Sequence, residues 1–501
     1  MRSMQKIEIK QNNDLKKVNK CNISNICGGC QYTGLDYARQ LEQKQTNIEK
    51  LLASFGPVDK IVGMENPYHY RNKVCAEFKK LKNGKLISGR YQEGTHKVIQ
   101  TDNCMIENEK ADEIIQSITT LFQSFKMTIY NEDKGFGLIR HVLVRTGHQT
   151  GQIMVIIVTA SPVFPSKKNF AKALLKVHPE ITTIVQNINT KDTSMVLGDR
   201  NQVIYGKGYI EDVLCGKRFR LSPGSFYQVN SVQTEKLYNR AVKYADLKKK
   251  ETIIDAYCGI GTIGIIASAH AKKVIGVELN PDAIRDAKIN SRMNQIENIE
   301  FYANDSGHFM TNLAEMNEKI DVVFMDPPRS GSDKPFLSSL IKLAPKKVVY
   351  ISCGPESLAR DLKYLTSKGY QVIKITPFDL FPFTEHVETV VMLSHKKPDS
   401  VINVKVEFGE GEGKVPLDNI AKRAEAYKPK ERVTYKMIKE YIEAKYGFKV
   451  HTAYIAEVKR DLGLPMYDAP NAVEELKQPR KHPTPEKVEA IKDALKHFEV
   501  I

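Results

Sequence analysis

The chain has 501 residues, of which 41% are hydrophobic and 27% charged, and it carries a formal net charge of +16 with a pI of about 9.2. This composition is typical of a soluble globular protein, and no run approaches the ~18 consecutive apolar residues of a membrane span. The excess of Lys and Arg favours a polyanionic partner, because these side chains release counterions from phosphates. The polar N-terminus lacks the apolar segment of a secretory signal, so we expect a cytoplasmic protein.

The patterns along the chain predict five segments. Residues 1–20 form a basic arm, and residues 21–222 combine a cysteine-rich start, a helix and the short β-type runs of a mostly antiparallel α+β region. Residues 223–396 alternate strand-like and helical stretches, which predicts an α/β, doubly wound, Rossmann-like domain. Residues 397–430 are polar and carry GEGEGK, typical of a linker, and residues 431–501 predict a small helical extension.

A glycine-rich turn, IIDAYCGIGTIGI, lies between a buried strand and a helix. Glycines such as Gly259 let the backbone approach a ligand, and the helix N-terminus offers free N–H groups. Glu278 ends the next strand, where its carboxylate can accept hydrogen bonds from both ribose hydroxyls. Asp305 follows the third strand and is placed to meet an adenine amino group. The glycines also satisfy G-x-G-x-x-G, so this motif alone leaves both S-adenosylmethionine and NAD open.

Two polar turns follow the fourth and fifth strand-like runs. Asp326 opens the turn in MDPPRSG, a motif similar to that of amino-methylating enzymes, although Arg329 takes the place of their usual aromatic residue. Cys353, in ISCGPE, precedes a helix whose N-terminus is expected to lower the thiol pKa and favour the thiolate. The alternative for Cys353 is a small buried core residue. Glu388 begins the last strand-like run, where it is a candidate general base beside a rim cysteine.

Methylation of carbon 5 of uracil requires this pair of groups. Carbon 5 is a poor nucleophile, but a thiolate that adds to carbon 6 turns the ring into an enolate that can attack a sulfonium methyl group. A base must then remove the proton on carbon 5 so that the cysteine can leave by elimination. In a structured RNA, the uridine must first be flipped out of its stack.

DAYCGIGTIG, MDPPRSG, ISCGPESLARD and FPFTEHVETV, with SPGSFYQVN upstream, resemble the RNA 5-methyluridine methyltransferase family over about residues 21–395. This family includes the 23S ribosomal RNA uracil-5-methyltransferases and the tRNA uracil-54 enzyme. The resemblance implies Cys353 as nucleophile, Glu388 as base and Phe226 as an aid in stacking the target base. It places these residues around S-adenosylmethionine: Gln228, Tyr257, Thr262, Glu278, Asp305 and Asp326.

Cys21, Cys27 and Cys30 form a C-x5-C-x2-C pattern that offers three thiolates to a metal. Cys104 is the natural candidate for the fourth ligand, and Cys75 is its rival. Four thiolates suit zinc or an iron–sulfur cluster, and the spacing does not separate the two. Ribosomal members of the family hold a [4Fe–4S] cluster with this spacing and a distant fourth cysteine, which the resemblance matches to Cys104.

We therefore predict an S-adenosylmethionine-dependent enzyme that methylates a uridine of 23S ribosomal RNA, because many bacterial tRNA uracil-54 enzymes lack the cluster. A tRNA uracil-54 methyltransferase is the nearest alternative. An inactive iron–sulfur RNA-binding or assembly factor and a nicotinamide-dependent oxidoreductase are further alternatives, and the Cys353–Glu388 pair argues against both. The segment before Cys21 is too short for the RNA-binding β-barrel (TRAM domain) of many ribosomal members. We expect a monomer that binds RNA, with neither DNA nor a membrane as partner.

Overall fold

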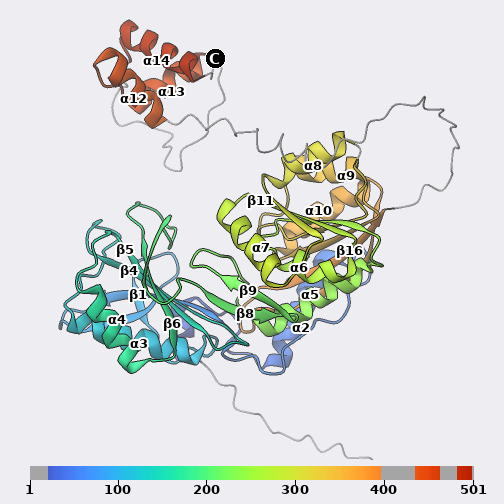
Figure 1. Cartoon of the computed structure of the whole chain (residues 1–501), viewed down its shortest axis with the longest axis horizontal. Helices are drawn as coiled ribbons and strands as arrows, with labels where there is room; N and C mark the ends of the chain where they lie inside the picture. The colour runs from blue at the N-terminus through green and yellow to red at the C-terminus, as the bar shows by residue number, and fades with distance from the viewer. Residues whose placement is uncertain (1–20, 317, 396–434, 463–481, 499–501) are drawn as a thin grey trace, which may run out of the picture. The chain divides into compact units, whose positions relative to one another are not determined.

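The computed structural model describes residues 21–316, 318–395, 435–462 and 482–498. The chain divides into two units, Met1–Lys414 and Val415–Ile501, and each is described by itself (Figure 1). The predicted arm at 1–20 and the predicted linker at 397–430 lie outside the described residues. Among the described helices, none has the length and apolar character needed to cross a membrane.

A helix near the start of the first unit is tied to the far end of that unit. The predicted helix is present as α2 (Tyr37–Leu52), and it follows the short α1 (Ser24–Cys27). Lys44 of α2 places its Nζ 2.6 Å from Asp379 Oδ1, and both side chains are fully buried. A buried charge is tolerated only with such a partner, so this ion pair fastens α2 to the segment after residue 378.

The first sheet has the order β3-β2-β1-β4-β5-β6-β7, and α3 and α4 cover one of its faces (Figure 1). All its pairs are antiparallel except β5–β6, which agrees with the predicted α+β region. Phe122 of α3 and Phe170 of α4 stack with ring centroids 5.2 Å apart in the core beneath this face. The elements are β1 (Lys73–Lys80), β2 (Leu86–Tyr91), β3 (Val98–Gln100), α3 (Glu109–Ser124), β4 (Ile139–Thr146), β5 (Ile153–Thr159), α4 (Lys167–Val177), β6 (Ile181–Ile188) and β7 (Arg200–Tyr205).

The second sheet has the order β12-β11-β10-β13-β14-β16-β15. Its first five strands are parallel, and β16 runs antiparallel to both β14 and β15. The strand order reverses between β10 and β13, the kind of position where α/β sheets bind ligands at the carboxyl ends of their strands. The strands are β10 (Thr252–Ala256), β11 (Lys273–Glu278), β12 (Ile299–Ala303), β13 (Val322–Met325), β14 (Lys347–Ser352), β15 (Tyr370–Phe378) and β16 (Glu388–His395).

Helices lie on both faces of this sheet, so the predicted α/β, doubly wound fold is confirmed (Figure 1). Residues of β10, β13 and β14 are nearly all buried, as expected for a parallel sheet covered on both sides. The helices are α5 (Ser231–Ala245), α6 (Thr262–Ala267), η1 (Ser268–His270), α7 (Pro281–Met293), α8 (Ser306–Glu315), α9 (Lys334–Leu343) and α10 (Pro355–Ser367).

The hairpin of β8 (Ile210–Leu214) and β9 (Lys217–Leu221) links the two sheets through one hydrophobic core. Leu143 of the first sheet, Phe219 of the hairpin and Ile253 of the second sheet are buried in that core. The two sheets of the first unit are therefore packed together rather than joined only by the chain.

The second unit contains three described helices: α12 (Tyr435–Tyr446), α13 (Thr452–Asp461) and α14 (Pro485–His497). These helices lie within the helical extension that the sequence predicts for residues 431–501. Ile442, Ile455 and Ile491 are fully buried, one from each helix, so the three helices share a core of their own.

Candidate functional site

Cys353 and Glu388 lie close together at the rim of the second sheet. The antiparallel register of β14 and β16 ends at the pair Ser352–Thr389, and Cys353 and Glu388 are the next residues on the two sides. The charge of Glu388 raises the pKa of the Cys353 thiol, so the two side chains are near each other. The structure thus brings together the two residues that the sequence predicts as the reacting pair.

The loop that carries Asp326 packs against the turn after β14. Ser357 at the start of α10 donates a hydrogen bond to the carbonyl oxygen of Arg329, at 2.8 Å. A Cβ on Gly354 would lie only 2.6 Å from that same oxygen, so the close approach requires glycine. This packing places Asp326 and Arg329 next to Cys353.

Burial controls the acidity of this rim. It raises the pKa of Glu388 to about 8, with a further rise from Asp326 and an opposing effect from Arg329. Burial also raises the pKa of Asp326 to about 7. Both carboxyl groups therefore have a pKa close to neutral pH, so each can gain or lose a proton there.

The expectation of a lowered Cys353 pKa is wrong. Burial raises the pKa of this thiol to about 11, and the charges of Glu388 and Asp326 act in the same direction. Arg329 opposes the rise without reversing it. Desolvation and two carboxylates outweigh the N-terminus of α10, so the resting side chain is a thiol rather than a thiolate.

The glycine-rich turn after β10 adopts left-handed backbone at Tyr257 (φ +64°), Gly259 (φ +56°) and Gly261 (φ +84°). For a tyrosine this conformation is strained, and such strain is concentrated at functional sites. A Cβ on Gly259 would meet nothing within 4 Å, so the backbone at this position faces open space. The turn therefore offers a ligand direct access to its main chain.

Glu278 ends β11 beside this turn. One of its oxygens accepts a hydrogen bond from the Gly259 N–H at 3.2 Å, and the other accepts from the Asn280 N–H at 2.8 Å. Asp305 caps α8, with Oδ1 accepting from the His308 N–H at 2.9 Å. Both carboxylates lie at the carboxyl ends of neighbouring strands, which is the edge predicted for the nucleoside.

Tyr238, which the sequence analysis did not single out, links several predicted site residues. Burial raises its pKa, Asp326 adds to the rise, and hydrogen bonds with Thr262 and Gln228 oppose it. Tyr238 lies on the buried face of α5, where its spacing is that of an ordinary core aromatic residue. The sequence carries no signal that distinguishes it from one.

Phe226 is 63% exposed although it is a large apolar residue. It lies two residues before Gln228, in the segment between β9 and α5. Tyr257 has its hydroxyl 3.3 Å from the Ser332 hydroxyl. Tyr257 and Glu278 thus lie at the carboxyl ends of β10 and β11, and Tyr238 connects Gln228 to Thr262 of the same region.

Cys21, Cys27, Cys30 and Cys104 line one hollow of the surface, together with residues that include Arg71 and Arg90. Burial and the three other cysteines raise the pKa of Cys30 to about 12, and Arg71 opposes the rise. Cys75, the rival for the fourth position, does not line this hollow. The structure therefore groups the four cysteines of the prediction and leaves the rival outside.

A doubly wound sheet with a strained glycine turn and a carboxylate after its second strand is the architecture of nucleotide-binding α/β enzymes, a class that includes the S-adenosylmethionine-dependent methyltransferases. A family model described as tRNA (Uracil-5-)-methyltransferase matches residues 36–396, and the chain belongs to this family. The predicted enzyme class, an RNA (uracil-5-)-methyltransferase, is thereby confirmed.

Two curated relatives carry the description "Uncharacterized RNA methyltransferase". The one from Clostridium tetani is 42% identical over 379 residues, which cover 75% of this chain and 82% of the relative. The one from Bacillus cereus is 40% identical over 384 residues, which cover 76% of this chain and 83% of the relative.

The chain is also similar to a solved structure, the Pyrococcus abyssi tRNA (uracil-54, C5)-methyltransferase in complex with S-adenosyl-L-homocysteine. The TM-score is 0.61 at 28% identity, and the match covers 73% of this chain and 85% of the other.

Proposed function

We propose that this protein methylates carbon 5 of a uridine in 23S ribosomal RNA through a covalent bond between Cys353 Sγ and carbon 6 of the base. The observation that carries the proposal is that Cys353 and Glu388 directly follow the last register pair of β14 and β16, close enough for the charge of Glu388 to raise the pKa of the thiol. A uracil ring held between them would meet a sulfur and a carboxyl group at once, which is the requirement of the addition–elimination route.

The raised pKa of Cys353 means that its proton must leave as the sulfur adds. That proton can pass to solvent, because Cys353 is only partly buried. Glu388, with a pKa of about 8, is the neighbouring group suited to the later removal of the carbon 5 proton. Bound S-adenosylmethionine supplies an electrophilic methyl group. After the methyl group has moved to carbon 5, Glu388 takes the carbon 5 proton. The carbon 5–carbon 6 double bond then re-forms, and the bond from carbon 6 to Cys353 breaks.

The residues present fit S-adenosylmethionine. The open space at Gly259 admits a ligand, and Asp255 Oδ1 is a buried acceptor with no hydrogen-bond partner among the described residues. The solved structure of the Pyrococcus abyssi enzyme, which contains S-adenosyl-L-homocysteine, supports this choice of cofactor. We assign these residues to the methyl donor: Gln228, Tyr257, Gly259, Thr262, Glu278, Asp305 and Asp326.

We propose that Cys21, Cys27, Cys30 and Cys104 hold a [4Fe–4S] cluster. Four thiolates on one zinc ion would bring their sulfurs to within about 3.8 Å of each other. Among the described residues, the ligand group whose atoms lie within 4.8 Å of one another is a different one, so these cysteines are spaced more widely than zinc requires. Arg71 and Arg90 beside them would offset the negative charge of a thiolate-bound cluster.

The four-cysteine group favours ribosomal RNA as the substrate, because ribosomal members of the family hold a cluster with this spacing and many bacterial tRNA uracil-54 enzymes lack one. Some archaeal relatives that hold a cluster act on tRNA. A tRNA uracil-54 activity is the second candidate, since the solved relative at 28% identity is a tRNA (uracil-54, C5)-methyltransferase. Phe226 is exposed, so its ring is free to stack on a flipped base in either case.

A methylation assay tests the proposal directly. The purified protein, radiolabelled S-adenosylmethionine and either 23S ribosomal RNA or total tRNA are combined, and the product is mapped by mass spectrometry. We expect 5-methyluridine in the ribosomal RNA. Methylation of tRNA alone would favour the second candidate, and no 5-methyluridine in either RNA would contradict the proposed reaction.

A further inference from the structure

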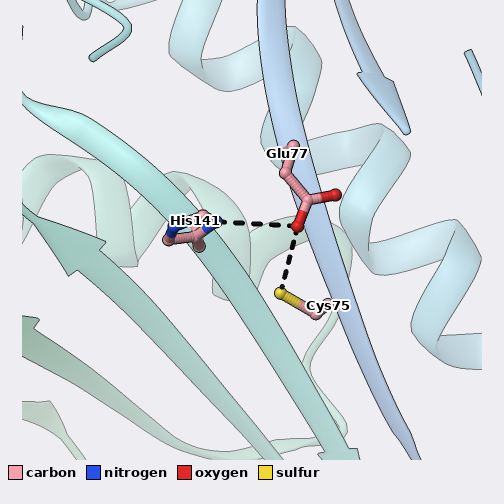
Figure 2. Close-up of side chains that lie close together, drawn as sticks. All are labelled: Cys75, Glu77 and His141. Atoms are coloured by element: carbon pink, nitrogen blue, oxygen red, sulfur yellow. Dashed lines mark hydrogen bonds and ion pairs between the residues drawn. The ribbon is translucent and has the colours of Figure 1, made fainter. Parts of the chain in front are cut away.

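A second group of ligand-type side chains lies on the first sheet, far along the chain from the reacting pair. Figure 2 shows Cys75 and Glu77 projecting from β1 toward His141 on the neighbouring β4. Glu77 is directly opposite His141 in the register, and Cys75 shares the face of Glu77 because it lies two residues away. The intervening Ala76 faces the opposite core, beneath α3 and α4.

The ligand atoms of this group are spaced as a single metal ion would require. Cys75 Sγ lies 3.6 Å from Glu77 Oε1, and His141 Nδ1 lies 3.6 Å from the same oxygen. All the ligand atoms lie within 4.8 Å of one another. Tetrahedral zinc bound to one sulfur, one nitrogen and one oxygen places neighbouring ligand atoms roughly 3.3–3.7 Å apart.

His141 supplies an independent sign that a ligand belongs here. The residue is 7% exposed, and its Nδ1 is a buried atom with no hydrogen-bond partner among the described residues. The 3.6 Å to Glu77 is too long for a hydrogen bond from nitrogen to oxygen. A buried ring nitrogen without a partner is unfavourable, and a metal ion between the two atoms would satisfy it.

The other ring nitrogen faces a second carboxylate. His141 Nε2 lies 3.9 Å from Glu132 Oε1. With a metal ion bound at Nδ1, the ring proton would be on Nε2, on the side of this carboxylate. Glu132 is itself held by Arg140, whose guanidinium donates to it at 2.7 Å.

We propose that Cys75, Glu77 and His141 form a zinc site, separate from the four-cysteine group, with a water molecule in the fourth position. The thiolate and the carboxylate together supply two negative charges, which match the charge of the ion. Without a metal, the thiol of Cys75 would only donate a weak hydrogen bond to Glu77, and His141 Nδ1 would stay unsatisfied.

This zinc site would brace the strands that support the substrate loop. At the far end of β4, Arg145 donates a hydrogen bond to the carbonyl oxygen of Ser225. Just before β1, Asn72 donates to the carbonyl oxygen of Gln228 at 3.0 Å. These two hydrogen bonds hold the segment that contains Phe226. A metal ion that joins β1 to β4 would therefore fix the two strands that support this segment.

The proposal is tested by metal analysis of the full-length protein. Its iron content is first restored under anaerobic conditions, and zinc is supplied. We expect about one zinc per chain in addition to iron. Cys75→Ser and His141→Asn should lose the zinc and keep the iron, whereas the control Cys215→Ser should keep both. Zinc that remains in both Cys75→Ser and His141→Asn, or that never binds to the unaltered chain, would overturn the proposal.

Cobalt provides a readout that does not depend on how well a variant of β1 folds. Co²⁺ added to the unaltered protein should give a thiolate-to-cobalt charge-transfer band, and Cys30→Ser should keep this band while losing iron. A band lost in Cys30→Ser but kept in Cys75→Ser would assign the metal to the four-cysteine group and overturn the proposal. The absence of any band in the unaltered protein would overturn it as well.

Discussion

Two cysteine–glutamate pairs lie on the two sheets of the first unit, and their surroundings differ. Cys353 and Glu388 lie next to the last register pair of β14 and β16, at the rim of the second sheet. Cys75 and Glu77 lie within the first sheet beside a buried histidine. Burial raises the thiol pKa in both pairs, so acidity alone does not separate their roles.

Access and partners separate the two pairs. Cys353 follows a strand at the edge where parallel strands end, and a flipped base can reach it. Cys75 lies within a strand, and the buried atom without a hydrogen-bond partner beside it is one ring nitrogen, His141 Nδ1. The first arrangement suits a large substrate that comes and goes, and the second suits an ion that stays.

The largest expected effect is at Cys353. Replacement by alanine should lower methyl transfer by about 10⁴-fold or more, because no other group can activate carbon 5. Binding of S-adenosylmethionine should persist. Single-turnover transfer of label to RNA measures the loss, and calorimetry measures the binding; Cys215→Ala is the matched control. Transfer at the normal rate in Cys353→Ala would remove the nucleophile from the account.

Glu388→Gln should slow turnover by about 10²- to 10⁴-fold and trap a protein–RNA adduct, since the carbon 5 proton then has no base to accept it. The adduct is detected as a slower band on a denaturing gel. The double variant Cys353→Ala/Glu388→Gln should form no such band. Normal turnover by Glu388→Gln would show that Glu388 is not the base that removes the carbon 5 proton.

The pH profile distinguishes the rim from an ordinary exposed carboxylate. Glu388 acts as a base only when ionised, and its pKa is raised to about 8. The rate of product release in a single turnover should therefore rise by about tenfold per pH unit below that value and level off above it. Cofactor affinity measured over the same range serves as the control. A rate that levels off near pH 5 would contradict the raised pKa.

Tyr238→Phe should produce the smallest effect. The change removes a hydroxyl that hydrogen bonds with Thr262 and Gln228, a loss of about 1 kcal/mol or roughly fivefold. The KM for S-adenosylmethionine should rise by that factor with kcat nearly unchanged. Tyr350→Phe, whose hydroxyl bonds to Asp361 beneath α10, is a control for lost hydroxyls in the same domain. An unchanged KM in Tyr238→Phe would place the residue in the core alone.

The rim was predictable from the sequence because its residues follow strand ends that hydrophobic runs make visible. Asp326 and Cys353 each come directly after such a run, and Glu388 begins the last one, so the fold brings them to one edge. The pKa of Cys353 was not predictable, because it depends on burial and on two carboxylates from other strands.

Two other kinds of contact could not be predicted from the sequence: those that depend on strand register, and those between residues far apart in the chain. Glu77 meets His141 only because β1 and β4 pair in one register, and Cys75 entered the sequence analysis only as a rival cluster ligand. Lys44 and Asp379 are 335 residues apart and have no shared pattern. Periodicity reports which face of an element is buried, but it does not report what that face meets.

The most direct measurement uses RNA that contains 5-fluorouridine, together with S-adenosylmethionine. Fluorine in place of the carbon 5 proton cannot be removed by Glu388, so addition and methyl transfer should proceed and elimination should stop. The account predicts a stable adduct, with mass spectrometry placing a methylated fluorouridine on the peptide that contains Cys353. Methyl transfer without an adduct, or an adduct on another cysteine, would contradict it.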